Sequence, residues 1–402
     1  MAPRPGLLLS LVGASALVCV VLYLAYASLW QGDRDGLNHA VGRDFINMWT
    51  ASQLLEAGRT ADIFDQDKFA AAQRRQLGPD FPFHFWSYPP QALLLTSGLS
   101  SLLHYKWALA AWLVCDLFFM LLAARLFWPG SGLPWLLLLA PSGFVNILLG
   151  QNGFITTALA VAGFAVLPQR AVVAGIMFGL LTFKPQLGIL IPIALIAMRQ
   201  WSAMAAAAVT AALLLGLTHV SYGGDVWLQF WQSTMPHQMR FMAEAEGPFQ
   251  WMMPGWFMAG RIIGLPLWLS QAVQAVMALA AVIVVYRAFR GQEDWRLKVA
   301  ILFVATFVAS PQGFNYDMGL VSVAILCLVV AALRTGWRRG EFIVIALCWV
   351  LPLTMMPLNA IGLPVAPLLL LALLACLYGR REMLLEPDGD VAEGGMPQGP
   401  VQ

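Results

Sequence analysis

The chain alternates between apolar segments and short polar ones. Its first apolar segment, Leu7–Leu29, carries no charged residue. A helix of about 20 apolar residues spans the hydrocarbon core of a bilayer. The length of this segment and its lack of a small-residue cleavage pattern favour a retained transmembrane helix over a secretory signal. Twelve further apolar segments follow, and they predict an all-α polytopic membrane protein. These are Pro89–His104, Trp107–Phe127, Leu133–Leu149, Phe154–Leu167, Ala171–Phe183, Leu187–Met198, Ala203–Val220, Leu267–Arg287, Val299–Ala309, Met318–Leu333, Phe342–Met356 and Leu363–Tyr378.

Polar sequence divides this pattern. The stretch 30–88 holds eight of the 21 acidic residues and predicts a large loop outside the membrane. Residues 382–402 are rich in Gly, Pro and acids, which predicts a disordered cytoplasmic tail. The expected organisation is one membrane domain over 1–381, with a first helix at 7–29, the loop at 30–88 and the remaining helices within 89–379.

Lys and Arg set the orientation, because they are enriched in cytoplasmic loops. In the second half of the chain, loops with several Arg residues alternate with loops that have none, so the long polar loop and Ser221–Gly255 are expected outside. That requires an even number of crossings between them, yet seven apolar segments lie there. One solution is that Leu133–Leu149, which Pro141 interrupts, enters the membrane and returns to the same side. The chain then crosses the membrane about 12 times, and both termini lie in the cytoplasm. The alternative, one broken crossing through Ala171–Met198, would place Arg170 outside.

Composition narrows the functional class. Hydrophobic residues make up 60% of the chain and charged residues 11%, and the mean hydropathy is +0.72. A soluble domain is about 45–50% apolar and about 25% charged, so a soluble enzyme is excluded. A net charge of +2 offers no field for a nucleic-acid partner. The five cysteines are widely spaced, and phosphate-loop, zinc-protease and serine-hydrolase motifs are lacking. We expect no metal site and no cofactor, although two readings of the loop acids Asp62 and Asp65 stay open: ligands of a divalent ion, or helix caps.

Asp44 is the first candidate for chemistry. It lies in an aromatic-rich stretch just after the first helix, near the expected membrane boundary. Partial desolvation there is expected to raise the pKa of the carboxyl and make it a competent base near neutral pH. Two structural readings remain open: the acid caps a helix that begins near Phe45, or it pairs with Arg43.

Three charged groups lie in or between apolar segments. Pro185 breaks the helix after Lys184, so a lone ammonium is expected at a helix end, where it suits a phosphate or carboxylate or anchors the helix at the interface. Asp317 ends a turn that is dense in hydrogen-bonding groups and begins at Ser310; a site and an ordinary turn both fit. Asp116 lies mid-span, where we expect a structural contact to another helix.

Ordered motifs add a resemblance. The sequence contains R-D-F-x-N-x-W, then Y-P-P, G-Q-N, F-K-P-Q and a late S-P-x-x-x-x-Y-D. Together these resemble glycosyltransferase family 87, which consists of polytopic enzymes with the GT-C fold. The resemblance implies inverting transfer of a hexose, with mannose favoured, from a polyprenyl-phosphate sugar to a lipid or glycan acceptor. The reaction is expected outside the cytoplasm, at a bacterial plasma membrane.

The resemblance also implies roles for single residues, with Asp44 as general base. Residues implied in binding the donor phosphate or sugar are Lys184, Gln151, Asn152, Gln186 and Arg43. Residues implied in positioning the acceptor or the loop are Tyr88, Asn47, His237, Gln312, Asn315, Tyr316 and Asp317. The late motif departs from the family, in which a histidine often follows Ser-Pro. A transporter or flippase of lipid-linked saccharides is the alternative function, although polar groups gathered at one surface favour an enzyme.

Overall fold

The computed structural model describes residues 5–244, 247–292 and 294–380, and in these residues all regular secondary structure is helical, without a β-strand. The predicted tail at 382–402 lies outside them. Five helices of the described part are long and apolar enough to cross a membrane. They are α1 (Pro5–Ala27), α6 (Tyr105–Phe127), α13 (Trp201–Tyr222), α18 (Leu267–Arg290) and α21 (Glu341–Ala360). The predicted all-α membrane class is confirmed.

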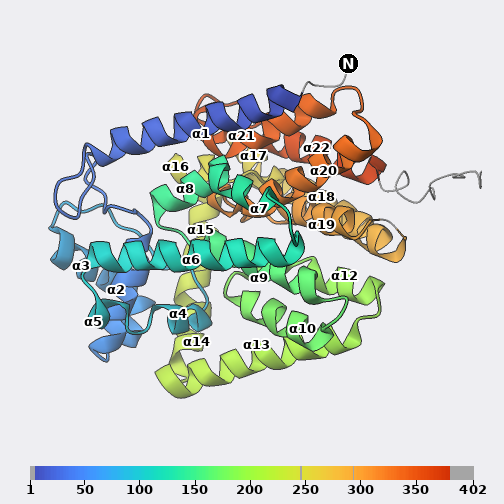
Figure 1. The fold of residues 1–402 in the computed structure, drawn as a ribbon. Coiled ribbons are helices and arrows are strands. Elements are labelled where there is room, and N and C mark those ends of the chain that lie inside the picture. Colours follow the sequence, from blue (N-terminus) through green and yellow to red (C-terminus); the bar gives the residue numbers. More distant parts are fainter. Residues whose placement is uncertain (1–4, 245–246, 293, 381–402) are drawn as a thin grey trace, which may run out of the picture.

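Shorter apolar helices complete the bundle (Figure 1). They are α8 (Pro141–Leu149), α9 (Gly153–Val166), α10 (Ala171–Leu180), α12 (Ile191–Ala197), α19 (Trp295–Ala309), α20 (Gly319–Thr335) and α22 (Ala366–Arg380). Helix α19 lies in the core, with every residue from Val299 to Ala309 buried. A helix that is apolar all round is stable only where neighbours surround it.

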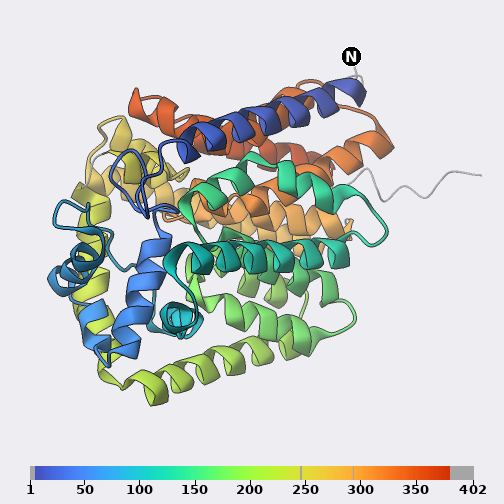
Figure 2. The same cartoon turned by 60° about the vertical axis from the view of Figure 1, so that its left-hand side comes forward.

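One end of the bundle carries the polar segments, and we call it the loop end. Here α2 (Phe45–Glu56), α3 (Gln66–Leu77) and the short α4 (Leu93–Thr96) and α5 (Leu99–Leu102) gather. On another side of this end lie α14 (Asp225–Gln229), η5 (Phe230–Thr234) and α15 (Met235–Glu244) (Figures 1 and 2). At the opposite end, buried Arg380 joins three helix termini. It pairs with buried Glu341 and donates to Thr335 Oγ1 over 2.6 Å.

Residues 133–149 differ from the expected re-entrant segment. They form α7 (Leu133–Leu136), η3 (Leu137–Leu139) and α8. The guanidinium of Arg125 lies 4.9 Å from the ring centroid of Trp135, which places the start of the segment beside the end of α6. At its other end, Leu149 O accepts a hydrogen bond from Asp44 N over 3.0 Å, at the loop end. The segment therefore runs from one end to the other, and the structure does not support a return.

Residues 89–104 also depart from the prediction of a crossing helix, which is wrong here. They form three short pieces: η2 (Pro90–Ala92), α4 (Leu93–Thr96) and α5 (Leu99–Leu102). Pro89 and Pro90 lack amide hydrogens, and Gly98 has a φ of +81°, which a continuing right-handed helix cannot contain. Both α4 and α5 pack on α2 instead. Without this segment, the number of crossing segments between the two loops expected outside is six, which is even, so no re-entrant segment is required. The total of about 12 crossings stays a prediction.

Candidate active site

The position of Asp44 depends on a close approach between the turn before α2 and the end of α8. Gly42 and Arg43 both have positive φ angles, +73° and +33°, and turn the chain into α2. Gly150, with a φ of +59°, ends α8, and a Cβ added to it would lie 2.5 Å from Gly42 O. Only glycine permits this approach, which brings Asp44 beside Gln151.

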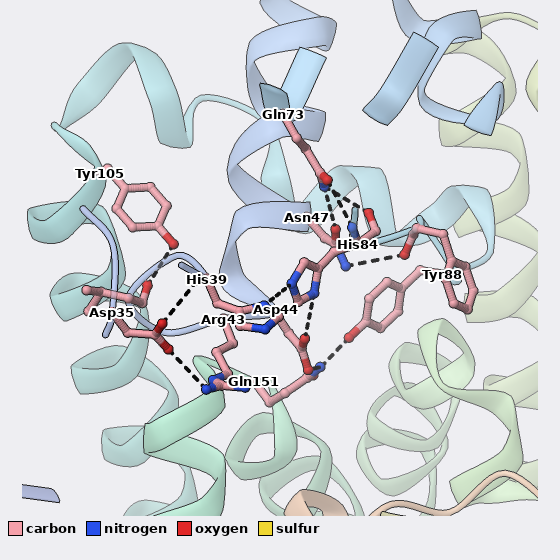
Figure 3. Close-up of polar contacts among 12 residues, drawn as sticks. Asp35, His39, Arg43, Asp44, Asn47, Gln73, His84, Tyr88, Tyr105 and Gln151 are labelled. Atoms are coloured by element: carbon pink, nitrogen blue, oxygen red, sulfur yellow. Dashed lines mark hydrogen bonds and ion pairs between the residues drawn. The ribbon is translucent and has the colours of Figure 1, made fainter. Parts of the chain in front are cut away.

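The Asp44 carboxylate is held by two side chains (Figure 3). Gln151 Nε2 donates to Asp44 Oδ2 over 2.8 Å, and His84 Nδ1 lies 3.3 Å from Asp44 Oδ1. The side chain makes no capping bond to α2 and is 21% exposed. Arg43 pairs with Asp35 instead, over 3.1 Å. Neither structural reading of Asp44 is therefore found.

The expectation of a raised pKa at Asp44 is wrong. Burial does raise the pKa of this carboxyl, but hydrogen bonds from His84 and Gln151, together with the charge of Arg43, outweigh burial and hold the pKa below its ordinary value. The sequence showed the apolar surroundings but not the donors. Asp44 is consequently ionised at neutral pH, which is the form a proton acceptor requires.

Tyr88 connects this carboxylate to a second cluster. Its hydroxyl donates to Gln151 Oε1 over 3.0 Å and accepts from Asn152 Nδ2 over 3.2 Å. Burial raises the pKa of Tyr88 far above neutral, so the hydroxyl keeps its proton. The Tyr88 ring centroid lies 6.0 Å from Lys184 Nζ.

Lys184 is paired, in contrast to the lone ammonium expected from the sequence. It precedes α11 (Pro185–Gly188), and its Nζ donates to Asp317 Oδ1 over 2.7 Å. Their side chains are 3% and 0% exposed. Asp317 lies in the short η6 (Asn315–Asp317), and the ring of Tyr316 stands 5.0 Å from the ammonium. The structure thus brings together two residues that are 133 positions apart in the sequence.

A cavity of about 410 Å³ opens beside this pair. Polar side chains lining it include Tyr88, Lys184, Gln186 and Gln312. Apolar side chains line it as well, among them Leu215, Trp227, Phe230, Trp231 and Phe314. Asp44 does not line this cavity. It is connected to Tyr88, which does line it, through Gln151, and its own side chain is partly exposed to solvent.

Other predicted residues hold the scaffold. Asn47 accepts from Gln73 Nε2 over 2.9 Å and donates to Phe85 O over 3.3 Å, which fixes the loop against α2. Asn315 donates to Pro352 O over 3.1 Å and so ties η6 to α21.

Two predicted residues lie on or beside α15. The ring of His237 packs on Phe85 with centroids 5.1 Å apart, and Gln312 reaches Met242 Sδ over 2.7 Å. Asp116 accepts from Ile155 N over 2.5 Å, which is the helix-to-helix contact expected of it.

His84 was not predicted from the sequence. This histidine stands between Phe83 and Phe85 in a loop without periodicity, so no pattern singled it out. Its position next to Asp44 depends on contacts between residues 40 positions apart.

Comparison with known proteins identifies a family. The model of glycosyltransferase family 87 matches residues 86–311, more than half of the chain. The matched part contains Tyr88, Gln151 and Lys184, whereas Asp44 and Asp317 flank it. Comparison with curated proteins and with solved structures gave no match. Within the described residues, no group of three or more His, Cys, Asp and Glu side chains is placed to hold a metal ion.

Proposed function

Because the chain belongs to glycosyltransferase family 87 and is therefore a glycosyltransferase, we propose that it uses a polyprenyl-phosphate sugar as donor. The sugar is a hexose, with mannose the first candidate, and the acceptor is a lipid or glycan outside the cytoplasm. One observation carries the proposal: an ionised, partly exposed Asp44 is joined through Gln151 and Tyr88 to a buried Lys184–Asp317 pair beside a cavity.

Asp44 acts as general base in this proposal. The acceptor hydroxyl oxygen attacks the anomeric carbon, its proton passes to the Asp44 carboxylate, and the bond from that carbon to the phosphate oxygen breaks. Attack opposite the leaving group inverts the configuration. Gln151, bonded to Oδ2, fixes the carboxylate in one orientation, which favours proton transfer.

Lys184 meets the charge of the leaving phosphate. An ammonium has three N–H donors, and Asp317 takes one of them, so donors remain for phosphate oxygens. Fixed donors stabilise charge that develops in the transition state at little reorganisation cost. Gln186 and Gln312 line the same cavity and supply further donors. Asp317, whose side chain is fully buried and does not line the cavity, holds the ammonium in place.

The apolar wall of the cavity supports a lipid-linked donor. A ligand with a phosphate and an isoprenoid tail needs a polar contact next to apolar surface, and Lys184 with Trp227 and Phe230 provides both. The site draws residues from Asp44 to Asp317, which supports a single domain over 1–381. Its location at the loop end, opposite the Arg-rich loops, supports an outward-facing site in a bacterial plasma membrane.

Transfer by purified protein tests the proposal. The chain in lipid nanodiscs is incubated with a panel of polyprenyl-phosphate hexoses and membrane lipid extract, and products are identified by mass spectrometry. Product is expected with a lipid-phosphate donor, and Asp44→Asn is expected to reduce turnover on the order of 100- to 10,000-fold while donor binding persists. Turnover by Asp44→Asn at the native rate would remove Asp44 as the base.

A further inference from the structure

His84 contacts the Asp44 carboxylate at the oxygen that Gln151 leaves open. Its Nδ1 lies 3.3 Å from Oδ1, whereas Gln151 bonds Oδ2. The two donors therefore bracket the carboxylate from both sides (Figure 3).

The scaffold fixes the backbone of His84. Gln73 on α3 is fully buried and forms two hydrogen bonds to it: Nε2 donates to His84 O over 2.8 Å, and His84 N donates to Oε1 over 3.0 Å. The imidazole also stacks on Phe81, with ring centroids 5.8 Å apart. A histidine held this firmly has little freedom to leave Asp44.

His39 fixes the remaining ring nitrogen. His39 Nδ1 lies 3.2 Å from His84 Nε2. Burial, followed by the charge of Arg43, lowers the pKa of His39, so His39 is neutral at neutral pH and has one ring proton to share. If Nδ1–H of His39 donates to Nε2 of His84, then Nδ1 of His84 must carry its own proton toward Asp44. The other charged group here is Asp35, which pairs with Arg43 and accepts the backbone N–H of His39 over 3.0 Å.

We propose that His84 is a positioning residue for the transfer reaction: it orients the Asp44 carboxylate and keeps it ionised, with His39 setting the tautomer of His84. This inference rests on the proposed function of Asp44. Nothing in the family motifs or in the matched residues 86–311 assigns this part to His84, which lies before the matched part.

The proposal predicts a shift in pH dependence of known sign. Activity falls at acidic pH where Asp44 becomes protonated. Without the donor at His84, burial dominates and the pKa of Asp44 rises. The acidic limb of the kcat–pH profile of His84→Ala is therefore expected to move to higher pH by about one unit. We also expect kcat at pH 7 to fall on the order of tenfold as the carboxylate loses its orientation. The KM for donor is expected to be unchanged, because His84 does not line the cavity.

Matched variants separate positioning from folding. His84→Asn places an amide donor where Nδ1 stood and is expected to restore the native acidic limb. His104→Ala removes an exposed histidine that precedes α6 and is expected to leave kcat and the limb unchanged. All variants are compared by thermal melting in nanodiscs.

A second readout does not require turnover. In chain labelled with ¹⁵N-histidine, Asp44→Asn is expected to move the ring-nitrogen resonances of His84 and leave those of His104 in place. Any of three results would overturn the inference. The acidic limb of the kcat–pH profile of active His84→Ala is not shifted, the His84→Ala and His84→Asn variants are impaired equally, or Asp44→Asn leaves the ring-nitrogen resonances of His84 unchanged. If the native chain transfers no sugar while the His84 resonances do respond to Asp44→Asn, the proposed function fails and the contact between the two side chains stands.

Discussion

Tyr88 shows how much of the site depends on single polar atoms. Its hydroxyl touches Gln151 and Asn152, and its ring lies above Lys184, so one side chain links the proposed base to the proposed phosphate contact. The sequence predicted the members of this network as polar groups near one surface. It could not predict their bonds, because each bond joins positions far apart in the chain. Lys184 was expected alone for the same reason: nothing near it in the sequence marks Asp317 as its partner.

Lys184→Met tests two roles of the lysine at this scale. Removing one partner of a buried ion pair costs about 3–5 kcal/mol of folding free energy, because the other charge is left uncompensated. Asp317→Asn in the same chain removes that charge. We expect the double variant to recover most of the melting temperature lost by Lys184→Met, yet to bind a polyprenyl-phosphate donor more weakly than native.

The same experiment compares the KM for the acceptor substrate with the KM for the donor. The KM for the acceptor is expected to change less than that for the donor, since Lys184 is assigned to phosphate. Lys106→Met, at an exposed lysine at the start of α6, is the matched control and is expected to behave as native. An equal effect of the double variant on donor and acceptor would make Lys184 purely structural.

At the scale of elements, uninterrupted apolar segments were predicted well and interrupted ones were not. Leu267–Arg287 became α18 with the same first residue, because nothing within it opposes a helix. Pro89–His104 contains two prolines and a glycine with positive φ, and it folds as short pieces on α2. Hydropathy measures burial and carries no information about backbone dihedral angles.

The junction of α8 with the loop before α2 yields a prediction about an element boundary. Gly150→Ala adds a Cβ that would lie 2.5 Å from Gly42 O and 2.8 Å from Phe45 Cβ, at a φ of +59°. Relief of this overlap displaces the turn that carries Asp44. The expected cost is about 2 kcal/mol of stability, and activity is expected to fall on the order of 100-fold because the base is misplaced.

Gly216→Ala is the matched control for that variant. Gly216 lies within α13, where an added Cβ meets no atom within 4 Å. Alanine is the better helix former by about 1 kcal/mol, so the melting temperature is expected to hold or rise, with full activity. Native kinetics for Gly150→Ala would show that the approach of the two backbones does not position Asp44.

At the scale of the whole molecule, alternation between two ends explains why distant motifs meet. Asp44 precedes α2, Gln151 follows α8, Lys184 follows η4 (Leu181–Phe183), and Asp317 follows α19, so each returns to the loop end. The sequence predicted this gathering from the Lys and Arg distribution together with the required even number of crossings. The course of individual segments was less predictable. The requirement for an even number of crossings shows that one segment does not cross but cannot identify which one. It led to the choice of Leu133–Leu149, whereas residues 89–104 are the exception.

Orientation in the membrane gives the last prediction. Gln151 and Ser310 are 6% and 1% exposed, so cysteines there would not react whichever side they face. Arg75 on α3 at the loop end and Arg339 before α21 at the opposite end are exposed. Arg75→Cys is expected to react with a charged, impermeant maleimide in intact cells, and Arg339→Cys only after permeabilisation, because Arg-rich loops stay in the cytoplasm. The parent chain with its own cysteines gives the background. The reverse pattern would place Asp44 on the cytoplasmic face, where nucleotide sugars are at hand and a lipid-phosphate donor would lose its rationale.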